Sequence, residues 1–228
     1  MKYSTLPPVW LLLLGLSAGW ANVAFVLAVI DGEVVRVLLL FYLTPVWASL
    51  LGWLLLGERL DRLTWLTVPA GLAGAMIMLW QPGVGLDWPP THADWLAFSA
   101  GLTFALSNVA TRRMGAVSVR LRTLVAWVGV VLIAGLLLHG NAAPIPQASV
   151  LAWGGALLLG MVGFFSCTVA TVYGVSHMPV QRSAVIMLFE IFIGGLSAWL
   201  LAGEAMDFSD WLGGALILGA GFIAATRT

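Results

Sequence analysis

Eight long apolar runs divide this chain of 228 residues and constrain its fold more than any other feature. Hydrophobic residues make up 61% of the sequence and charged residues only 9%, against about 25% charged in an ordinary soluble domain. Lipid offers the backbone no hydrogen-bond partner, so runs of this length must form helices. We therefore predict an all-α polytopic membrane protein of about eight transmembrane helices: Val9–Ile30, Val34–Gly57, Leu63–Trp80, Ala93–Thr111, Thr123–His139, Val150–Val175, Val180–Ala202 and Trp211–Thr226.

A short sequence occurs twice. Residues Trp53 to Glu58 read Trp-Leu-Leu-Leu-Gly-Glu, and residues Trp199 to Glu204 read Trp-Leu-Leu-Ala-Gly-Glu. The match extends over a whole helix pair, which indicates an internal duplication. The same offset pairs Arg36 with Arg182, Asp61 with Asp207 and Trp65 with Trp211.

The basic residues orient the predicted helices. If the N-terminus is cytoplasmic, Arg36 is the one basic residue on the opposite side of the membrane. This matches the positive-inside rule, by which Lys and Arg gather on the cytoplasmic side. The spans between the two copies then place Glu58 inside and Glu204 outside, an inverted-topology repeat as in many secondary transporters. We expect both termini to be cytoplasmic, with the remaining basic residues on that side: Lys2, Arg59, Arg62, Arg112, Arg113, Arg120, Arg122, Arg182 and Arg227.

The repeats carry a family resemblance. Leu43-Thr44-Pro45-Val46 through Leu60, with a glycine-rich helix after it, resembles the EamA module of the drug/metabolite transporter (DMT) superfamily. Phe189-Glu190-Ile191-Phe192 through Glu204 is similar to its C-terminal repeat. The resemblance implies a secondary-type transporter, in the exporting direction, that moves small organic solutes such as amino acids or metabolites by alternating access across a bacterial inner membrane.

The family usually has two repeats of five helices, whereas this chain resembles a version without the first two. We predict a first repeat of three helices over 1–81, a linker loop over 82–92 and a second repeat of five helices over 93–228. The chain is then either a natural short variant or a truncated one. A homodimer or a partner chain could restore the cavity wall, and the alternative is an accessory subunit or scaffold without transport of its own.

Glu190 is the strongest candidate for a substrate contact. It lies near the centre of its predicted span, where a charged carboxylate costs at least about 2.5 to 3.5 kcal/mol on insertion scales. We interpret it as a site for a substrate amine or a proton, with a neutral glutamate bonded to a neighbouring helix as the alternative.

Other polar or aromatic residues at depth complete the predicted cavity. Such side chains also bond to neighbouring helices or to their own backbone, so packing is the alternative for each. We expect the solute to contact Trp20, Asn22, Tyr42, Thr44, Thr103, Asn108 and Thr168 together with Glu190.

The repeated motif is assigned to structure and gating rather than to binding. We expect the Glu58 carboxylate to stabilise the N-terminus of the helix that follows it. Pro45 predicts a helix kink in the first copy, and Ile191 at the matching position predicts that the second copy has none. The motif comprises Pro45, Gly57, Glu58, Gly203 and Glu204.

Other functions receive little support from the sequence. Gly15-Leu16-Ser17-Ala18-Gly19 matches the nucleophile elbow of hydrolases but lies inside an apolar run, which leaves a membrane-embedded hydrolase as a remote alternative. A net charge of zero suggests no nucleic acid partner, and a single cysteine excludes a multi-cysteine metal site. We predict no catalytic residue, cofactor or metal; the expected partners are the lipid bilayer and a small solute.

Overall fold

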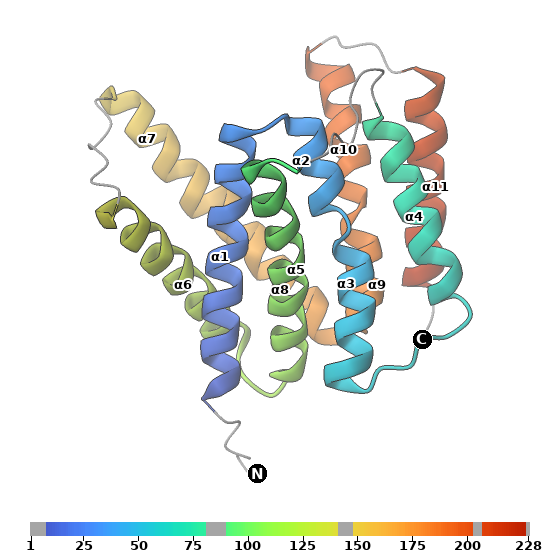
Figure 1. Ribbon diagram of the computed structural model, residues 1–228, viewed down its shortest axis with the longest axis horizontal. Helices are drawn as coiled ribbons and strands as arrows, with labels where there is room; N and C mark the ends of the chain where they lie inside the picture. Colours follow the sequence, from blue (N-terminus) through green and yellow to red (C-terminus); the bar gives the residue numbers. More distant parts are fainter. Residues whose placement is uncertain (1–7, 81–89, 141–147, 203–206, 227–228) are drawn as a thin grey trace.

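The computed structural model is all-helical over the residues it describes, 8–80, 90–140, 148–202 and 207–226 (Figure 1). Three π-helical turns, η1 (Gly52–Leu56), η2 (Leu159–Phe164) and η3 (Ala198–Ala202), continue α-helices. The α-helices are α1 (Val9–Asp31), α2 (Val34–Phe41), α3 (Thr44–Leu51), α4 (Thr64–Leu79), α5 (His92–Arg113), α6 (Val119–Gly140), α7 (Val150–Leu158), α8 (Phe165–His177), α9 (Val180–Met187), α10 (Phe189–Ser197) and α11 (Phe208–Ala225).

Within the described residues, six stretches are long and apolar enough to cross a membrane. The other two predicted spans correspond to α4, an apolar helix of 16 residues, and to α5, which has 22 residues but is not among the six. The all-α class is therefore confirmed, and the count of eight spans stays a prediction. The six stretches are Val9–Asp31, Val34–Leu56, Val119–Gly140, Val150–His177, Val180–Leu201 and Phe208–Ala225.

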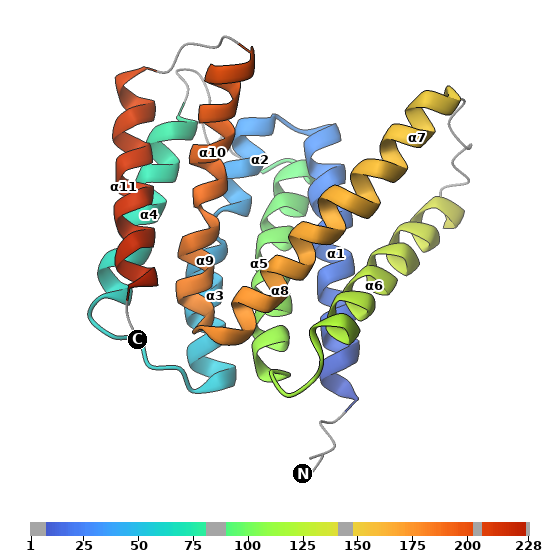
Figure 2. The ribbon, with the colours of Figure 1, turned by 180° about the vertical axis from the view of Figure 1, so that it is seen from behind.

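Two stretches are broken at matching positions of the sequence repeat. Helix α2 ends at Phe41 and α3 begins at Thr44, while α9 ends at Met187 and α10 begins at Phe189. Figures 1 and 2 show the α2–α3 and α9–α10 stretches running in opposite directions through the molecule. The inverted relationship of two complete halves remains a prediction.

The break in the second copy corrects the expectation drawn from Ile191. There the Leu188 N–H donates to the Val185 carbonyl at 3.2 Å and the Ile191 N–H donates to the Leu188 carbonyl at 3.1 Å. These bonds span three residues instead of four and tighten the turn. A helix can therefore be interrupted here without the proline that stands at the first break.

Small residues let the helices approach closely. A Cβ atom added at Gly19 in α1 would lie 2.5 Å from the Gly129 carbonyl oxygen in α6. One added at Gly74 in α4 would lie 2.6 Å from the Gly213 carbonyl oxygen in α11. Contacts of this kind are typical of helices packed in membranes. They hold α1 to α6 on one side of the molecule and α4 to α11 on the other (Figure 1).

Carboxylates stabilise helix starts, including those of α4 and α5. The Asp61 carboxylate accepts the Thr64 N–H at 2.8 Å where α4 begins. At the start of α5, the Asp94 N–H donates to the Thr91 hydroxyl, and the Asp94 carboxylate accepts the Thr91 N–H at 2.6 Å, which is a capping box. Asp94 also pairs with Arg36 through two bonds of 2.6 and 2.7 Å, which fasten α2 to α5.

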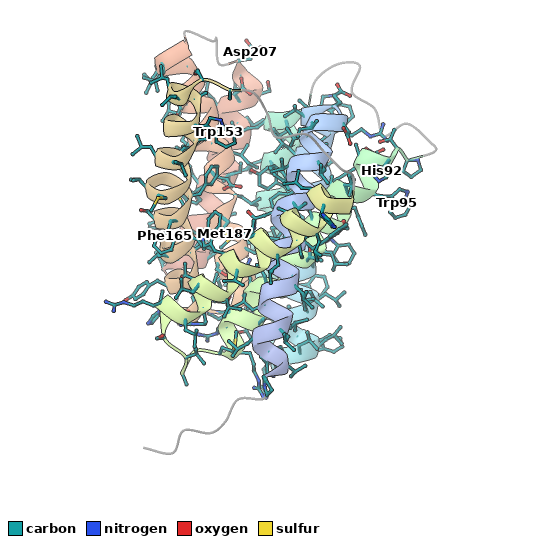
Figure 3. All side chains as sticks on the ribbon, turned by 90° about the vertical axis from the view of Figure 1, so that its left-hand side faces the viewer. His92, Trp95, Trp153, Phe165, Met187 and Asp207 are labelled. Carbon is teal, nitrogen blue, oxygen red and sulfur yellow. The ribbon has the colours of Figure 1, made fainter. Side chains whose placement is uncertain are left out.

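The stretch from Val150 to His177 lies on the outer side of the molecule. Only 6% of the 18 residues in its apolar segment are buried, against 44% for the same length of α1. Figure 3 shows Trp153 of α7 and Phe165 of α8 along this stretch, with α6 crossing in front of the bundle. One face of the molecule is thus built from α6, α7 and α8, and it borders the site described next.

Candidate functional site

A cavity of about 410 Å³ lies between the helices near the two breaks. Residues from α1, α2, α5, α6, α8 and α10 contribute to it, and aromatic side chains form much of its wall. This volume is within the range of about 300 to 1,000 Å³ that small-molecule sites occupy. Its polar lining residues include Asn22, Tyr42, Ser107, Asn108, Thr168 and Glu190.

Tyr42 and Glu190 meet in this cavity. The Tyr42 hydroxyl donates to Oε1 of Glu190 at 2.6 Å. Tyr42 follows the last residue of α2 and Glu190 is the second residue of α10, so each stands at one of the two helix breaks. The breaks therefore bring one polar side chain from each copy of the repeat to the same point.

Charge in the cavity has one sign. Of the described lining residues, only Glu190 is an acid, and none is Lys, Arg or His. Glu190 is exposed to the cavity rather than enclosed by protein, with its Oε1 held by Tyr42. The site can therefore accept hydrogen bonds or oppose a positive charge, but its lining offers no fixed cation to an anionic group.

Five of the eight predicted contact residues line this cavity. Besides Tyr42 and Glu190 they are Asn22, Asn108 and Thr168. Asn22 donates to the Ala18 carbonyl at 2.9 Å, and Thr168 donates to the Phe164 carbonyl at 2.8 Å. Both side chains thus bond to their own helix while they face the cavity. Their role in binding stays a prediction.

The other three predicted contact residues lie outside the described lining and bond to the protein. The Trp20 indole N–H donates to the Ser99 hydroxyl at 3.1 Å. Thr44 is buried, and its hydroxyl lies 2.6 Å from the Phe41 carbonyl oxygen and 3.3 Å from that of Gly101. The Thr103 hydroxyl donates to the Ser99 carbonyl at 2.7 Å. These contacts match the packing alternative in this conformation.

Glu58 contacts a different helix from the one predicted. Its Oε2 accepts the Val180 N–H at 3.0 Å, at the start of α9, whereas Asp61 caps the following helix α4. Gly57, with φ of 69°, reverses the chain in the left-handed region that favours glycine. Pro45 stands in the first turn of α3. Gly203 and Glu204 lie outside the described residues.

Two arginines lie beside Thr111, a lining residue of the cavity, and join several helices there. Arg112 lies 3.4 Å from Glu58 and donates to the Ser176 carbonyl at 2.7 Å. Arg122 is 1% exposed and donates to the Thr111 carbonyl at 2.8 Å and to the Ser176 hydroxyl at 2.5 Å. This group joins α5, α6, α8 and the segment that follows η1. The sequence placed both arginines at a membrane surface but held no signal that paired them with Ser176.

The aromatic wall also went unpredicted, because aromatic residues occur throughout the apolar runs and their spacing does not say which of them face inward. Among the described residues, no group of three or more His, Cys, Asp or Glu side chains could hold a metal ion. The cavity therefore presents recognition chemistry: aromatic faces, hydroxyls, amides and one carboxylate. The aromatic lining residues are Phe25, Phe41, Tyr42, Phe104, Trp127 and Phe164.

Comparison with known proteins gives consistent results. The model of the EamA-like transporter family matches residues 2–80 and 91–226. An uncharacterized transporter of Archaeoglobus fulgidus is 31% identical over 208 residues, which cover 90% of this chain and 71% of that protein. A riboflavin transporter of Rhizobium johnstonii is 31% identical over 73% of this chain, and the uncharacterized transporter YojE of Bacillus subtilis is 29% identical over 71%.

The matches to the last two proteins span 53% and 52% of their lengths, so the alignment covers about half of each. A solved crystal structure superposes with a TM-score of 0.75 at 21% identity and covers 97% of this chain and 77% of that one. At that identity the likeness shows a shared fold and nothing more.

Proposed function

This chain belongs to the EamA-like transporter family and is an integral multi-pass membrane protein, and we propose that it exports small organic solutes by alternating access. The observation that carries the proposal is the Tyr42–Glu190 hydrogen bond of 2.6 Å inside a cavity of about 410 Å³. A carrier needs its binding site near the middle of the membrane, between the two copies of the repeat. Rocking of one half against the other then exposes the site to one side of the membrane and then to the other.

The proposed halves that move against each other are residues 1–81 and 93–228.

The Arg112 and Arg122 contacts with Ser176 support a closed end beside the cavity, which would have to open for release of the solute. The start of α1 and the end of α11 lie at that same end of the molecule in Figure 1, as does the Glu58–Val180 contact. Because arginines gather there, we place this end in the cytoplasm of a bacterial cell, with the protein in the inner membrane.

Candidate solutes are amino acids, other metabolites and aromatic compounds. The aromatic wall supports a solute with a flat or apolar portion, because aromatic faces stack on rings and attract cations. The name of the Rhizobium relative adds flavins to the compounds worth testing. The carboxylate of Glu190 would bind a solute amine or exchange a proton during the cycle.

A second candidate function is that of an accessory subunit that transports only with a partner. The outer stretch from Val150 to His177 favours it, because only 6% of the 18 residues in its apolar segment are buried. A partner chain or a second copy of this chain would then complete the wall beside α7 and α8.

Flux through reconstituted protein tests the proposal. We would measure counterflow of labelled amino acids, metabolites and riboflavin into liposomes that contain the purified chain. Glu190→Gln should lower saturable flux at least about tenfold, which corresponds to about 1.4 kcal/mol. Glu33→Gln is the matched control, because Glu33 is exposed and lies outside the described lining. Equal flux from Glu190→Gln and wild type at every pH would remove Glu190 from the mechanism, and flux only with an added partner would favour the accessory role.

A further inference from the structure

A second, larger hollow adjoins the cavity. It has a volume of about 620 Å³ and lies between α1, α6 and η2. This hollow, the apolar groove, is adjacent to the cavity, because Asn22, Trp127, Val130 and Phe164 line both spaces.

The two spaces differ in chemistry. Apart from the shared residues, the described lining of the apolar groove is aliphatic, as in Val26, Leu27, Leu137 and Leu138. The cavity, in contrast, holds the carboxylate of Glu190 and no basic side chain among its described lining residues. A molecule that fills both the cavity and the apolar groove would need a positively charged end and an apolar end.

We propose that the solute is an amphipathic organic cation, whose positive group binds Glu190 in the cavity and whose apolar body occupies the apolar groove. This rests on the proposed function, because it takes the cavity as the transport site. A positive group compensates the carboxylate, and aromatic faces in the cavity wall attract the same charge. The apolar body gains affinity in proportion to the area it removes from water.

Other solute classes fit less well. A small polar solute would leave the apolar groove unused, and an anion would meet the negative charge of Glu190 without a basic residue in the described lining. A lipid chain could enter the apolar groove from the bilayer, but it would not need the carboxylate. Dependence on both charge and apolar length therefore distinguishes the proposed solute from each alternative.

Cys167 offers a test that does not require transport. It is the single cysteine of the chain, it is exposed, and it lines the cavity. The rate at which N-ethylmaleimide modifies it, followed by mass spectrometry, reports whether the cavity is occupied. Butyl-, hexyl- and octyltrimethylammonium would serve as cationic probes, and octyl sulfate and octanol as anionic and neutral controls of the same length.

We expect octyltrimethylammonium to slow modification of Cys167 at a concentration at least about tenfold below that needed for the butyl ion. Octyl sulfate and octanol should not protect, and Glu190→Gln should remove protection by all three cations. Protection that is equal for the sulfate, the alcohol and the cation would overturn the proposal. So would protection that does not change with chain length.

A filled apolar groove sharpens the test. A Cβ atom added at Gly160, which lines the groove, would meet no atom within 4 Å, so the larger side chain of Gly160→Leu has room to enter it. This variant should abolish the advantage of the octyl over the butyl ion and leave butyl protection unchanged. Gly154→Leu is the matched control, because Gly154 is equally open and lies outside the described groove lining. An unchanged octyl advantage in Gly160→Leu would overturn the role of the groove.

Flux and protection separate the two proposals. The chain could transport a solute while these cations neither protect Cys167 nor compete with that solute. The transport function would then stand, and the cationic solute class would be wrong. If the cations protect Cys167 with the expected length dependence but no flux occurs, the solute class stands and autonomous transport fails.

Discussion

The two helix breaks occupy matching positions in the repeat, yet their side chains lie in opposite surroundings. At the first break, Thr44 is 4% exposed and its hydroxyl contacts the carbonyl oxygens of Phe41 and Gly101. At the second break, Glu190 is exposed to the cavity and accepts a bond from Tyr42. The first break is thus fastened to α5, while the carboxylate at the second break lines the cavity.

This difference shows how a duplicated element can divide its tasks. The backbone interruption is common to both copies although Thr44 and Glu190 differ in chemistry, so it does not depend on one particular side chain. At the first break Thr44 contacts a neighbouring helix, whereas at the second break Glu190 lines the cavity. Substitutions that disturb the contact of Thr44 with Gly101 should therefore change stability, and substitutions of Glu190 or of its partner Tyr42 should change solute recognition.

The largest effect on this comparison should come from Gly101→Ala. A Cβ atom at Gly101 would lie 2.7 Å from the Phe41 carbonyl oxygen, which is backbone and cannot swing away. We expect a loss of about 1 to 3 kcal/mol in stability, measured as thermal unfolding in detergent. Gly135→Ala is the control, because a Cβ atom there meets nothing within 4 Å and the change should be neutral or stabilising. Equal stability of both variants would mean that the first break is not an anchor.

Tyr42→Phe should have an intermediate effect. It removes the bond of 2.6 Å to Glu190 and keeps the ring in place, so the carboxylate loses its orientation. We expect solute affinity to fall about two- to tenfold, the equivalent of about 0.5 to 1.5 kcal/mol, with the unfolding temperature unchanged. Tyr173→Phe removes a hydroxyl from an exposed residue of α8 and should bind as wild type does. A similar loss in both variants would contradict a specific role for the Tyr42 hydroxyl.

Thr44→Val should have the smallest effect. It deletes the hydroxyl that contacts Phe41 and Gly101 but keeps the shape of the side chain. Polar bonds inside membrane proteins contribute about 0.6 kcal/mol on average, so we expect a slight drop in unfolding temperature and flux within about twofold of wild type. A drop in flux as large as that of Glu190→Gln would show that the two breaks share the binding task after all.

The sequence was sufficient for the helical class and, in part, for the matching breaks. Apolar run length determines the first, because the bilayer leaves the backbone few alternatives. The cost of an intramembrane carboxylate predicts that Glu190 needs a compensating group, and the structure supplies Tyr42. The expectation that Ile191 would leave its helix straight was wrong, because tightened hydrogen bonds interrupt that helix without proline.

The helix face on which a polar residue lies could not be predicted. Trp20 and Asn22 are two positions apart in α1, yet the first bonds to Ser99 in α5 and the second lines the cavity. Hydropathy is nearly uniform around such a helix, so no amphipathic pattern tells the two faces apart. The same holds for Glu58, whose partner Val180 is far away in the sequence.

The contact between Glu58 and Val180 has a consequence for biosynthesis. The two residues are 122 positions apart, so a ribosome that adds about 5 to 20 residues per second needs about 6 to 24 seconds to supply the second after the first. During that interval the Glu58 carboxylate lacks the Val180 N–H that it later accepts. The chain up to Glu58 is therefore made before its partner at the start of α9 exists, and synthesis of α9 completes the contact.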